Sequence, residues 1–158
     1  MEPVMIKNKL AVPEATWLAL RQKLWPDCPP QKHRDEIRDI VRNPSLCAFF
    51  LCTADGQTAA FAEASVRTDY VNGCTTSPVA YLEGIYCEES ARRQGFAGQL
   101  IAQVKQWGAE NGCRELASDT SPDNTASQLL HRALGFTETE RVIFYCQPLA
   151  PLLPPEKR

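Results

Sequence analysis

A basic, glycine-containing stretch, Arg92-Arg93-Gln94-Gly95-Phe96-Ala97, holds the residue types that could bind an anion. It follows an apolar run that ends at Cys87 and precedes an amphipathic segment, so the pattern predicts a strand, a loop and a helix. Glycine lets backbone N–H groups approach a ligand closely, and a helix start favours negative charge. The stretch fits neither a Walker A loop nor a dinucleotide fingerprint, so it predicts another kind of phosphate site. The plainer interpretation is a turn with two solvated arginines.

Three acidic residues are placed where their carboxylates could meet a cationic substrate. Glu83 lies in the strand before the basic stretch, Asp119 follows a second short strand, and Glu140 lies in the last apolar segment. Carboxylates that converge on one cleft attract a polycation and steer it inward. The plainer interpretation makes Glu140 a surface charge and Asp119 the cap of a helix turn. The sequence leaves both interpretations open.

The cysteines suggest little further chemistry. Cys87 could act as a nucleophile if it ionised, but no histidine lies near it in the sequence. A small apolar thiol fits a buried strand equally well, so we expect no acyl-enzyme intermediate. The seven cysteines contain no C-x-x-C pair and the chain has only two histidines, so no zinc site is expected.

The composition predicts one folded domain. A chain of 158 residues with 44% hydrophobic and 23% charged residues can bury a proper core. Its net charge of -2 gives no support for binding to nucleic acid or to a membrane surface. No apolar run is long enough to span a membrane and no signal-peptide core is present, so we expect a cytoplasmic location. We expect one domain over residues 1–146 and a proline-rich tail over 147–158, with little reason to be ordered.

Hydrophobic periodicity places the candidate residues on a mixture of helices and strands. After an initial strand, helices are predicted over 13–24, 31–42 and 97–111, and a last helix opens at Ser121-Pro122 and ends at Gly135. Strands are predicted over 47–53, 58–67, 80–87, 114–117 and 137–146, with a hairpin at Asp55-Gly56. Gly84 within its strand indicates a bulge or a close backbone approach. The order predicts a single α/β layered domain, with small side chains at Ala60, Ala62 and Ala64 along one strand face.

The basic stretch resembles the R/Q-x-x-G-x-G/A signature of the GNAT superfamily of N-acetyltransferases, with Arg92, Gly95 and Ala97 in the fixed positions. Asn124 and the segment Leu134-Gly135-Phe136 follow it in the order that this superfamily has. From about residue 17 to 145 the chain is further similar to the chromosomal type of aminoglycoside 6'-N-acetyltransferase. The segments that carry this similarity are Asp69-Tyr70-Val71-Asn72-Gly73, Ser77-Pro78, Leu82-Glu83-Gly84-Ile85, Ala117-Ser118-Asp119, His131 to Phe136 and Thr139-Glu140-Arg141-Val142.

The resemblance implies a fold and a co-substrate. The GNAT fold has a central, mostly antiparallel twisted sheet flanked by helices, with a bulged strand before the acetyl-CoA loop. The loop of Arg92, Arg93, Gln94, Gly95, Phe96 and Ala97 would grip the pyrophosphate of coenzyme A. Backbone groups of Ile85, Tyr86 and Cys87 would pair with the pantetheine arm, and Asn124 would bond to the same arm. No metal is expected in the reaction.

The resemblance also implies a reaction. The 6'-amine of an aminoglycoside would attack the thioester of acetyl-CoA directly in a ternary complex, which would confer aminoglycoside resistance. Glu83 or Asp119 could act as general base through a water molecule, while backbone N–H groups freed by the bulge stabilise the oxyanion. The residues expected to bind the aminoglycoside are the acids Glu83, Asp119 and Glu140 and the aromatic walls Trp25 and Tyr70.

The proton donor to the coenzyme A sulfur departs from the common pattern. Many GNAT members carry a tyrosine seven residues after the helix asparagine, whereas the same count from Asn124 reaches His131. An imidazole could donate that proton at neutral pH. Alternatively, His131 packs against Leu130 and Leu134, and both interpretations stay open.

Two alternative functions stay open, and a homodimer is the expected assembly. A GNAT enzyme could act on another amine, such as a polyamine, a small metabolite or a protein N-terminus. A catalytically silent acetyl-CoA sensor would not need the acceptor acids. The resembled family commonly forms homodimers, some by exchanging the C-terminal strand, so a homodimer is expected.

Overall fold

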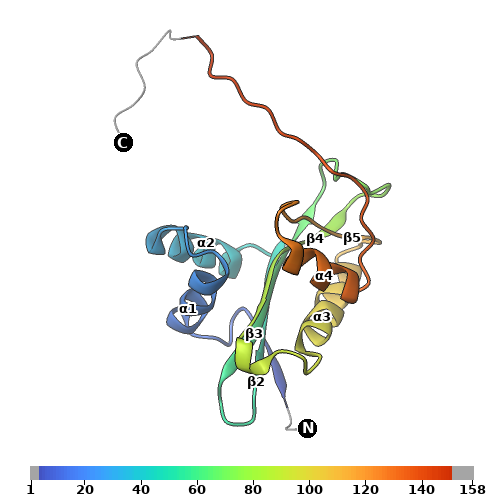
Figure 1. The fold of residues 1–158 in the computed structure, drawn as a ribbon. Helices are drawn as coiled ribbons and strands as arrows, with labels where there is room; N and C mark the ends of the chain where they lie inside the picture. The colour runs from blue at the N-terminus through green and yellow to red at the C-terminus, as the bar shows by residue number, and fades with distance from the viewer. Residues whose placement is uncertain (1–3, 151–158) are drawn as a thin grey trace.

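The sheet that carries the candidate residues has five strands in sequential order, β1 to β5 (Figure 1). The computed structural model describes residues 4–150. Neighbouring strands pair antiparallel from β1 to β4, and β5 pairs with β4 in parallel, which confirms the expected mostly antiparallel sheet. The strands are β1 (Met5–Asn8), β2 (Leu46–Cys52), β3 (Thr58–Arg67), β4 (Val79–Cys87) and β5 (Leu116–Ser118).

Helices cover both faces of this sheet (Figure 1). The helices are α1 (Glu14–Leu24), α2 (Pro30–Arg42), α3 (Phe96–Glu110) and α4 (Thr125–Ala133), with a short 3-10 turn, η1 (Glu89–Ala91). Alternate side chains of β2 pack in opposite directions, because Phe50 joins the core under α1 and α2 while Leu51 joins the core under α3. Burial on both faces explains the continuous apolar run of β2. None of the helices within residues 4–150 could cross a lipid bilayer.

The small side chains of β3 share one strand face, as predicted, and this face lies under α3. Ala60, Ala62 and Ala64 belong to the same buried cluster as Leu100 and Val104 of that helix. A row of methyl groups lets the helix approach the sheet closely, and α3 in turn carries the predicted anion-binding loop at its start. The packing of β3 therefore fixes where that loop stands relative to β4.

The predicted irregularity at Gly84 is present. Glu63 of β3 lies opposite Gly84, and Ala64 lies opposite Leu82, so Glu83 has no partner and forms a bulge in β4. The parallel pairing with β5 ends at the same place, since it joins only 80–82 to 116–118. Beyond Leu82 the two strands no longer pair.

Two expected element boundaries differ from the structure. The last helix does not open at Ser121-Pro122: α4 begins at Thr125, and the Oδ1 of Asn124 accepts a hydrogen bond of 3.0 Å from the backbone N–H of Ser127. Ser121 and Pro122 instead form the turn before the helix, in which the Ser121 carbonyl accepts from the Asn124 N–H at 3.0 Å. The strand predicted over 114–117 is found at Leu116–Ser118.

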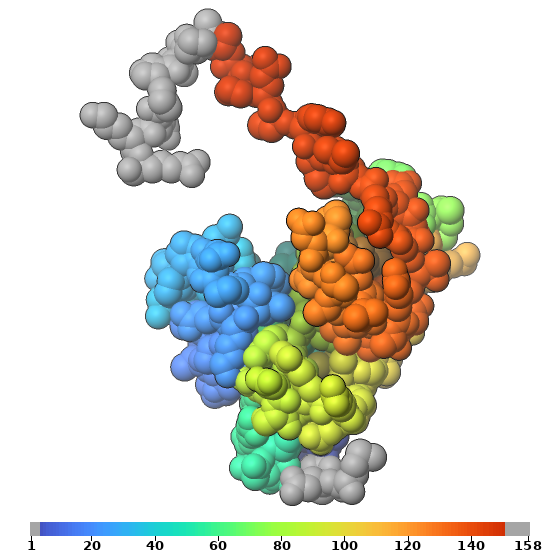
Figure 2. All heavy atoms as spheres, in the orientation of Figure 1, coloured from blue at the N-terminus to red at the C-terminus, as the bar shows by residue number. Residues whose placement is uncertain are grey.

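The strand predicted over 137–146 was wrong for the single chain. These residues are extended but pair with no strand among residues 4–150, and Figures 1 and 2 show the segment running along the domain before its later part leaves it. A strand needs a partner edge to satisfy its backbone groups, and an apolar pattern cannot reveal whether the same chain supplies one. Of the expected tail, 147–150 continue this exposed path and 151–158 lie outside the described residues.

Candidate active site

The residues predicted to hold the pantetheine arm lie where β4 and β5 stop pairing. Ile85, Tyr86 and Cys87 still pair with β3 through one edge of β4. Their other edge faces no strand within the described part of the chain. Backbone groups along such an edge can accept an extended ligand as an added strand.

The basic stretch forms a concave turn at the start of α3. Arg93 and Gly95 both have left-handed backbone angles, with φ of 66° and 77°. No side chain caps α3 and its first turn holds no acidic residue, so its first N–H groups stay available to an anion. Arg92 donates from Nε to the Cys87 carbonyl at 3.0 Å, which ties this turn to the end of β4. Phe96 is buried in the core, so only its backbone can reach a ligand.

Cys87 itself has the properties of a buried thiol. It is half-buried, and burial raises the pKa of its thiol above the ordinary value, against a smaller opposite effect of Arg92. A thiol with a raised pKa is a weak nucleophile at neutral pH. This agrees with the expectation that no acyl-enzyme intermediate forms at this residue.

Glu83 projects from the bulge and is held by two residues of β3. Ser65 donates its hydroxyl to Oε1 at 2.6 Å, and Arg67 donates from Nη2 to both carboxylate oxygens at 2.8 and 3.1 Å. The Glu83 side chain remains 36% exposed. Sequence reasoning missed both partners, although Glu63, Ser65 and Arg67 recur at the period of two that marks one strand face.

Asp119 is connected to Glu83 through two further side chains. The Tyr81 hydroxyl donates to Oδ2 of Asp119. The Arg67 guanidinium lies over the Tyr81 ring, 3.4 Å from its centre, while the same arginine pairs with Glu83. Burial, followed by Asp119, raises the pKa of Tyr81, so this tyrosine remains a hydrogen-bond donor. The two predicted acids thus belong to one cluster, and Tyr81 is a member that the sequence did not indicate.

Trp25 lies next to these acids. Its ring packs edge to face on Phe61, with 6.4 Å between ring centres, and stands directly over Gly84. It is partly buried, so one portion of the ring belongs to the core and another faces outward. The structure therefore brings Trp25 against the bulge that carries Glu83.

Tyr70 and Glu140 lie outside this cluster. Tyr70 is 78% exposed on the loop that joins β3 to β4. Glu140 is exposed on the extended C-terminal segment, whose Thr139 abuts Gly73 of the same loop. Within residues 4–150 neither residue has a hydrogen bond or ion pair to Glu83 or Asp119. These two predicted site residues thus lie on two segments that touch at Gly73 and Thr139, and neither is joined to the acids.

His131 has both ring nitrogens occupied. Nδ1 lies 2.7 Å from the Ser127 carbonyl, which can only accept, so Nδ1 carries the proton. Nε2 lies 2.7 Å from the Ser118 hydroxyl, whose single proton also has the Leu82 carbonyl, 3.3 Å away, as a partner. The ring packs on Phe136, with 5.2 Å between ring centres. Through these contacts the imidazole of His131 links α4 to the end of β5.

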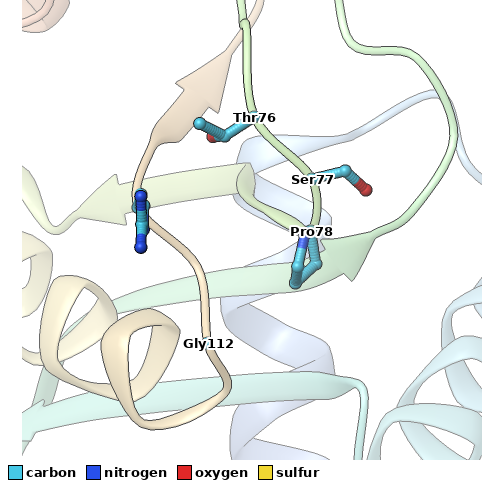
Figure 3. A pocket seen from close by; sticks show the side chains of 5 residues that line it. Thr76, Ser77, Pro78 and Gly112 are labelled. Atoms are coloured by element: carbon cyan, nitrogen blue, oxygen red, sulfur yellow. The ribbon is translucent and has the colours of Figure 1, made fainter.

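A hollow opens on this side of the molecule (Figure 2). Figure 2 shows it between the blue atoms of α1 and the orange atoms of α4, above the yellow-green atoms of the 88–95 loop. A separate pocket of about 350 Å³ lies at the start of β4, away from the bulge (Figure 3). It contains none of the predicted site residues and is lined by Thr76, Ser77, Pro78, Gly112 and Arg114.

Known proteins share this fold and much of this sequence. Residues 14–136 match the model of the acetyltransferase (GNAT) family. The chain is 58% identical over 133 residues to the aminoglycoside N(6')-acetyltransferase type 1 of Serratia marcescens, covering 84% of this chain and 91% of that protein. The corresponding protein of Salmonella typhimurium is 55% identical over 129 residues, covering 82% and 88%.

Solved structures give the same result. Aminoglycoside N-acetyltransferase AAC(6')-Iy in complex with CoA superposes with a TM-score of 0.87 at 47% identity, over 94% of this chain and 97% of that one. AAC(6')-Iy in complex with the bisubstrate analog CoA-S-monomethyl-acetylneamine gives 0.86 at 48% identity, over 93% and 99%. The chain therefore belongs to the GNAT family of acetyltransferases, within the group of aminoglycoside N(6')-acetyltransferases.

Proposed function

We propose that this enzyme transfers the acetyl group of acetyl-CoA to the 6'-amine of an aminoglycoside and so confers resistance to the antibiotic. The observation that carries the proposal is the position of Glu83, between the free edge of β4 and the cluster that includes Asp119. An acyl donor lying along that edge would meet a cationic acceptor held by the acids. A structural neighbour binds a molecule that joins CoA to an aminoglycoside fragment, in line with this arrangement.

The cofactor half of the site fits a diphosphate and an extended arm. The turn before α3 offers uncapped N–H groups, two arginines and no acid, as a polyanion requires. Asn124 uses its Oδ1 to cap α4, which leaves its side-chain NH₂ for the pantetheine arm. Bound acetyl-CoA supplies the activated acetyl group. The proposed binding residues are Ile85, Tyr86, Cys87, Arg92, Arg93, Gln94, Gly95, Phe96, Ala97 and Asn124.

In the acceptor half, Glu83 and Asp119 would bind the ammonium groups. Trp25 would form one wall, and Tyr70 and Glu140 would close over the substrate from the neighbouring loop and the C-terminal segment. The attacking amine must lose a proton, and Glu83 or Asp119 can receive it through a water molecule. Backbone N–H groups at the bulge would polarise the thioester carbonyl.

For His131 we propose a positioning role in place of the acid role. Its contacts hold Ser118, the residue before Asp119, against α4. Replacing His131 with asparagine should therefore disturb the binding of the aminoglycoside more than the pH dependence of kcat. A change in the basic limb of that pH profile would instead identify the imidazolium as proton donor to the leaving thiolate.

We also propose a homodimer formed by exchange of residues 137–146. Phe144 and Tyr145 are 88% and 90% exposed in the single chain, which is unusual for adjacent aromatic residues. β5 is the last strand of the sheet and offers a free edge within the described residues. The segment of a second copy could pair there and bury these side chains. A cytoplasmic location, where acetyl-CoA is available, belongs to the same proposal.

Thiol release from acetyl-CoA, with kanamycin or tobramycin as acceptor, tests the function. Asp119→Asn should lower kcat/KM by about 100-fold, because it removes both a charge partner and a candidate base. Asp123→Asn, an equally conservative change at an exposed acid nearby, should retain wild-type activity. Acetyl-CoA binding without turnover of any aminoglycoside would contradict the proposal and direct the search to polyamines, small amine metabolites or protein N-termini.

A further inference from the structure

Three side chains with metal-binding atoms meet where the loop after α1 leads into α2. Cys28 lies two residues before α2, His33 and Glu36 lie one turn apart on it, and one ligand atom of each lies within 4.8 Å of the others. Thiolate, imidazole and carboxylate are the ligands that zinc takes in proteins. None of the three residues belongs to the proposed acetyl-transfer site.

His33 is held in the form of a metal ligand. Its side chain is fully buried, with 0% exposure, and Nε2 lies 3.2 Å from the Trp25 carbonyl oxygen. A carbonyl only accepts, so Nε2 carries the proton and Nδ1 presents a lone pair. That Nδ1 is buried and has no hydrogen-bond partner in the described part of the chain. Metal-bound histidines usually donate their second ring N–H to a carbonyl in this way.

Glu36 can contribute an oxygen without losing its present partner. Arg21 donates from Nη2 to Oε2 of Glu36 at 2.6 Å, which leaves Oε1 for another ligand. Arg21 also has the Glu63 carboxyl as a partner, since Oε2 of Glu63 lies 3.1 Å from the Nε of Arg21. A carboxylate that binds a metal through one oxygen commonly accepts a hydrogen bond through its other oxygen.

The distances among these three ligand atoms are close to those among the ligand atoms around a bound zinc ion. Zinc bonds of about 2.0–2.3 Å in a tetrahedron hold ligand atoms about 3.3–3.8 Å apart. The ligand atoms lie within 4.8 Å of one another, so side-chain shifts of about 1 Å at Cys28 and Glu36 would bring their distances into that range. Both side chains are partly exposed. His33, which is fixed by its neighbours, need not move.

We propose that Cys28, His33 and Glu36 form an accessory site for a zinc-class divalent cation. The ligands are Sγ, Nδ1 and one carboxylate oxygen, with a water molecule in the fourth position. The Cys28 thiol releases its proton to solvent as the metal–sulfur bond forms. The sequence predicted no zinc site because the chain has no C-x-x-C pair. That prediction did not consider a set in which one cysteine combines with a histidine and a carboxylate.

The site would control the loop that carries Trp25. Metal on Nδ1 makes the opposite N–H of His33 a stronger donor to the Trp25 carbonyl, so the cation would fix this loop. This consequence alone rests on the proposed function, in which Trp25 is a wall of the acceptor site. Binding of the cation can be measured without any acetylation.

Cobalt titration of reduced, metal-free protein tests the site. A thiolate bound to Co²⁺ gives a charge-transfer absorption band in the near ultraviolet, and added Zn²⁺ should abolish it by displacement. We expect the wild type and Cys146→Ser, which lacks an exposed thiol elsewhere, to show the band equally. Cys28→Ser should lose the band, and Glu36→Gln should bind cobalt at least about 10-fold more weakly.

Three results would overturn the site: no band in the wild type, a band that persists in Cys28→Ser, or loss of the band in Cys146→Ser. Circular dichroism of each variant verifies its fold, and the buried His33 is left unchanged for that reason. Turnover of Cys28→Ser without added metal should equal that of the wild type. Failure of metal binding would remove the cobalt band and leave turnover intact. Failure of the proposed function would instead leave the wild type and all variants without turnover of an aminoglycoside.

Discussion

Trp25 stands over Gly84 so closely that a Cβ built on the glycine would lie 2.6 Å from Cη2 of the indole ring. The side chain of Leu24 would also lie 2.9 Å from that Cβ. The end of α1 therefore rests directly on the bulge of β4. Since Glu83 occupies the bulge, this contact sets the distance between the tryptophan and the neighbouring acid.

Gly84→Ala should displace Trp25 and weaken both the fold and the acceptor site. Overpacking of this kind costs about 1–3 kcal/mol of unfolding free energy. The KM for the aminoglycoside should rise while that for acetyl-CoA changes little. Urea denaturation and steady-state kinetics measure the two effects. Gly98→Ala is the matched control for stability, because a Cβ there meets no atom within 4 Å.

A double variant tests whether the cost comes from the indole ring. If it does, Gly84→Ala should destabilise a Trp25→Leu background much less than the wild type, giving a coupling energy of about 1 kcal/mol or more. Equal effects in both backgrounds would place the constraint in the backbone of the bulge instead.

In the proposed acceptor site, Arg67 would compete with the substrate for Glu83. The guanidinium occupies both oxygens of the carboxylate that an ammonium group would use. Arg67→Met should lower the KM for the aminoglycoside about fivefold, equivalent to about 1 kcal/mol for a partly exposed charge pair. High salt should reduce the difference. Arg38→Met, which removes a similarly exposed arginine paired with Glu14, should leave this KM unchanged. A rise in KM for Arg67→Met would show that Arg67 mainly holds Glu83 in position.

Glu63 should make stability depend on pH. Burial raises its pKa to about 7, although Arg21 and the Trp17 N–H oppose the shift. An acid with a raised folded-state pKa contributes stability that is complete below its unfolded pKa near 4.5 and is lost as pH rises through 7. The free energy of unfolding of the wild type, relative to Glu63→Gln, should therefore fall between pH 5 and pH 8 by about 1–3 kcal/mol. Urea titrations at both pH values measure it, and a constant difference would mean that Glu63 stays ionised.

The C-terminal segment should determine the oligomeric state. Ile143→Asp places a charge among apolar side chains that the proposed strand exchange buries, so it should convert a dimer to a monomer. Light scattering after size-exclusion chromatography measures the mass. Leu149→Asp introduces the same charge further along the chain and should leave the mass unchanged. A monomeric wild type would rule out the exchange.

Local patterns in the sequence predicted most of the fold correctly. The 3.6-residue period located α3, and the dipeptide Asp55-Gly56 marked a hairpin in which Gly56 has a φ of 87°. Gly84 indicated the bulge because a glycine within an apolar strand needs a structural reason. These features depend on neighbours in the chain and are therefore visible in it.

What the sequence could not predict depends on contacts between distant residues. Arg67 and Tyr81 join the two acids only through the register of β3 against β4, and no local pattern encodes that register. Ser121 seemed a good helix cap, but Asn124 competes for that role and wins it. The 137–146 segment ends in an apolar run that suits a strand, yet no strand among residues 4–150 pairs with it.

The free edge of β4 has a consequence for how such an enzyme can evolve. Main-chain N–H and C=O groups are common to nearly all residue types, so a donor site built from them tolerates substitution of the side chains around it. Acceptor recognition depends instead on individual carboxylates and rings, which single mutations can alter. Substrate range can therefore drift under antibiotic selection while the use of acetyl-CoA persists. An inhibitor that occupies the backbone edge would be harder to escape by mutation than one that mimics the drug.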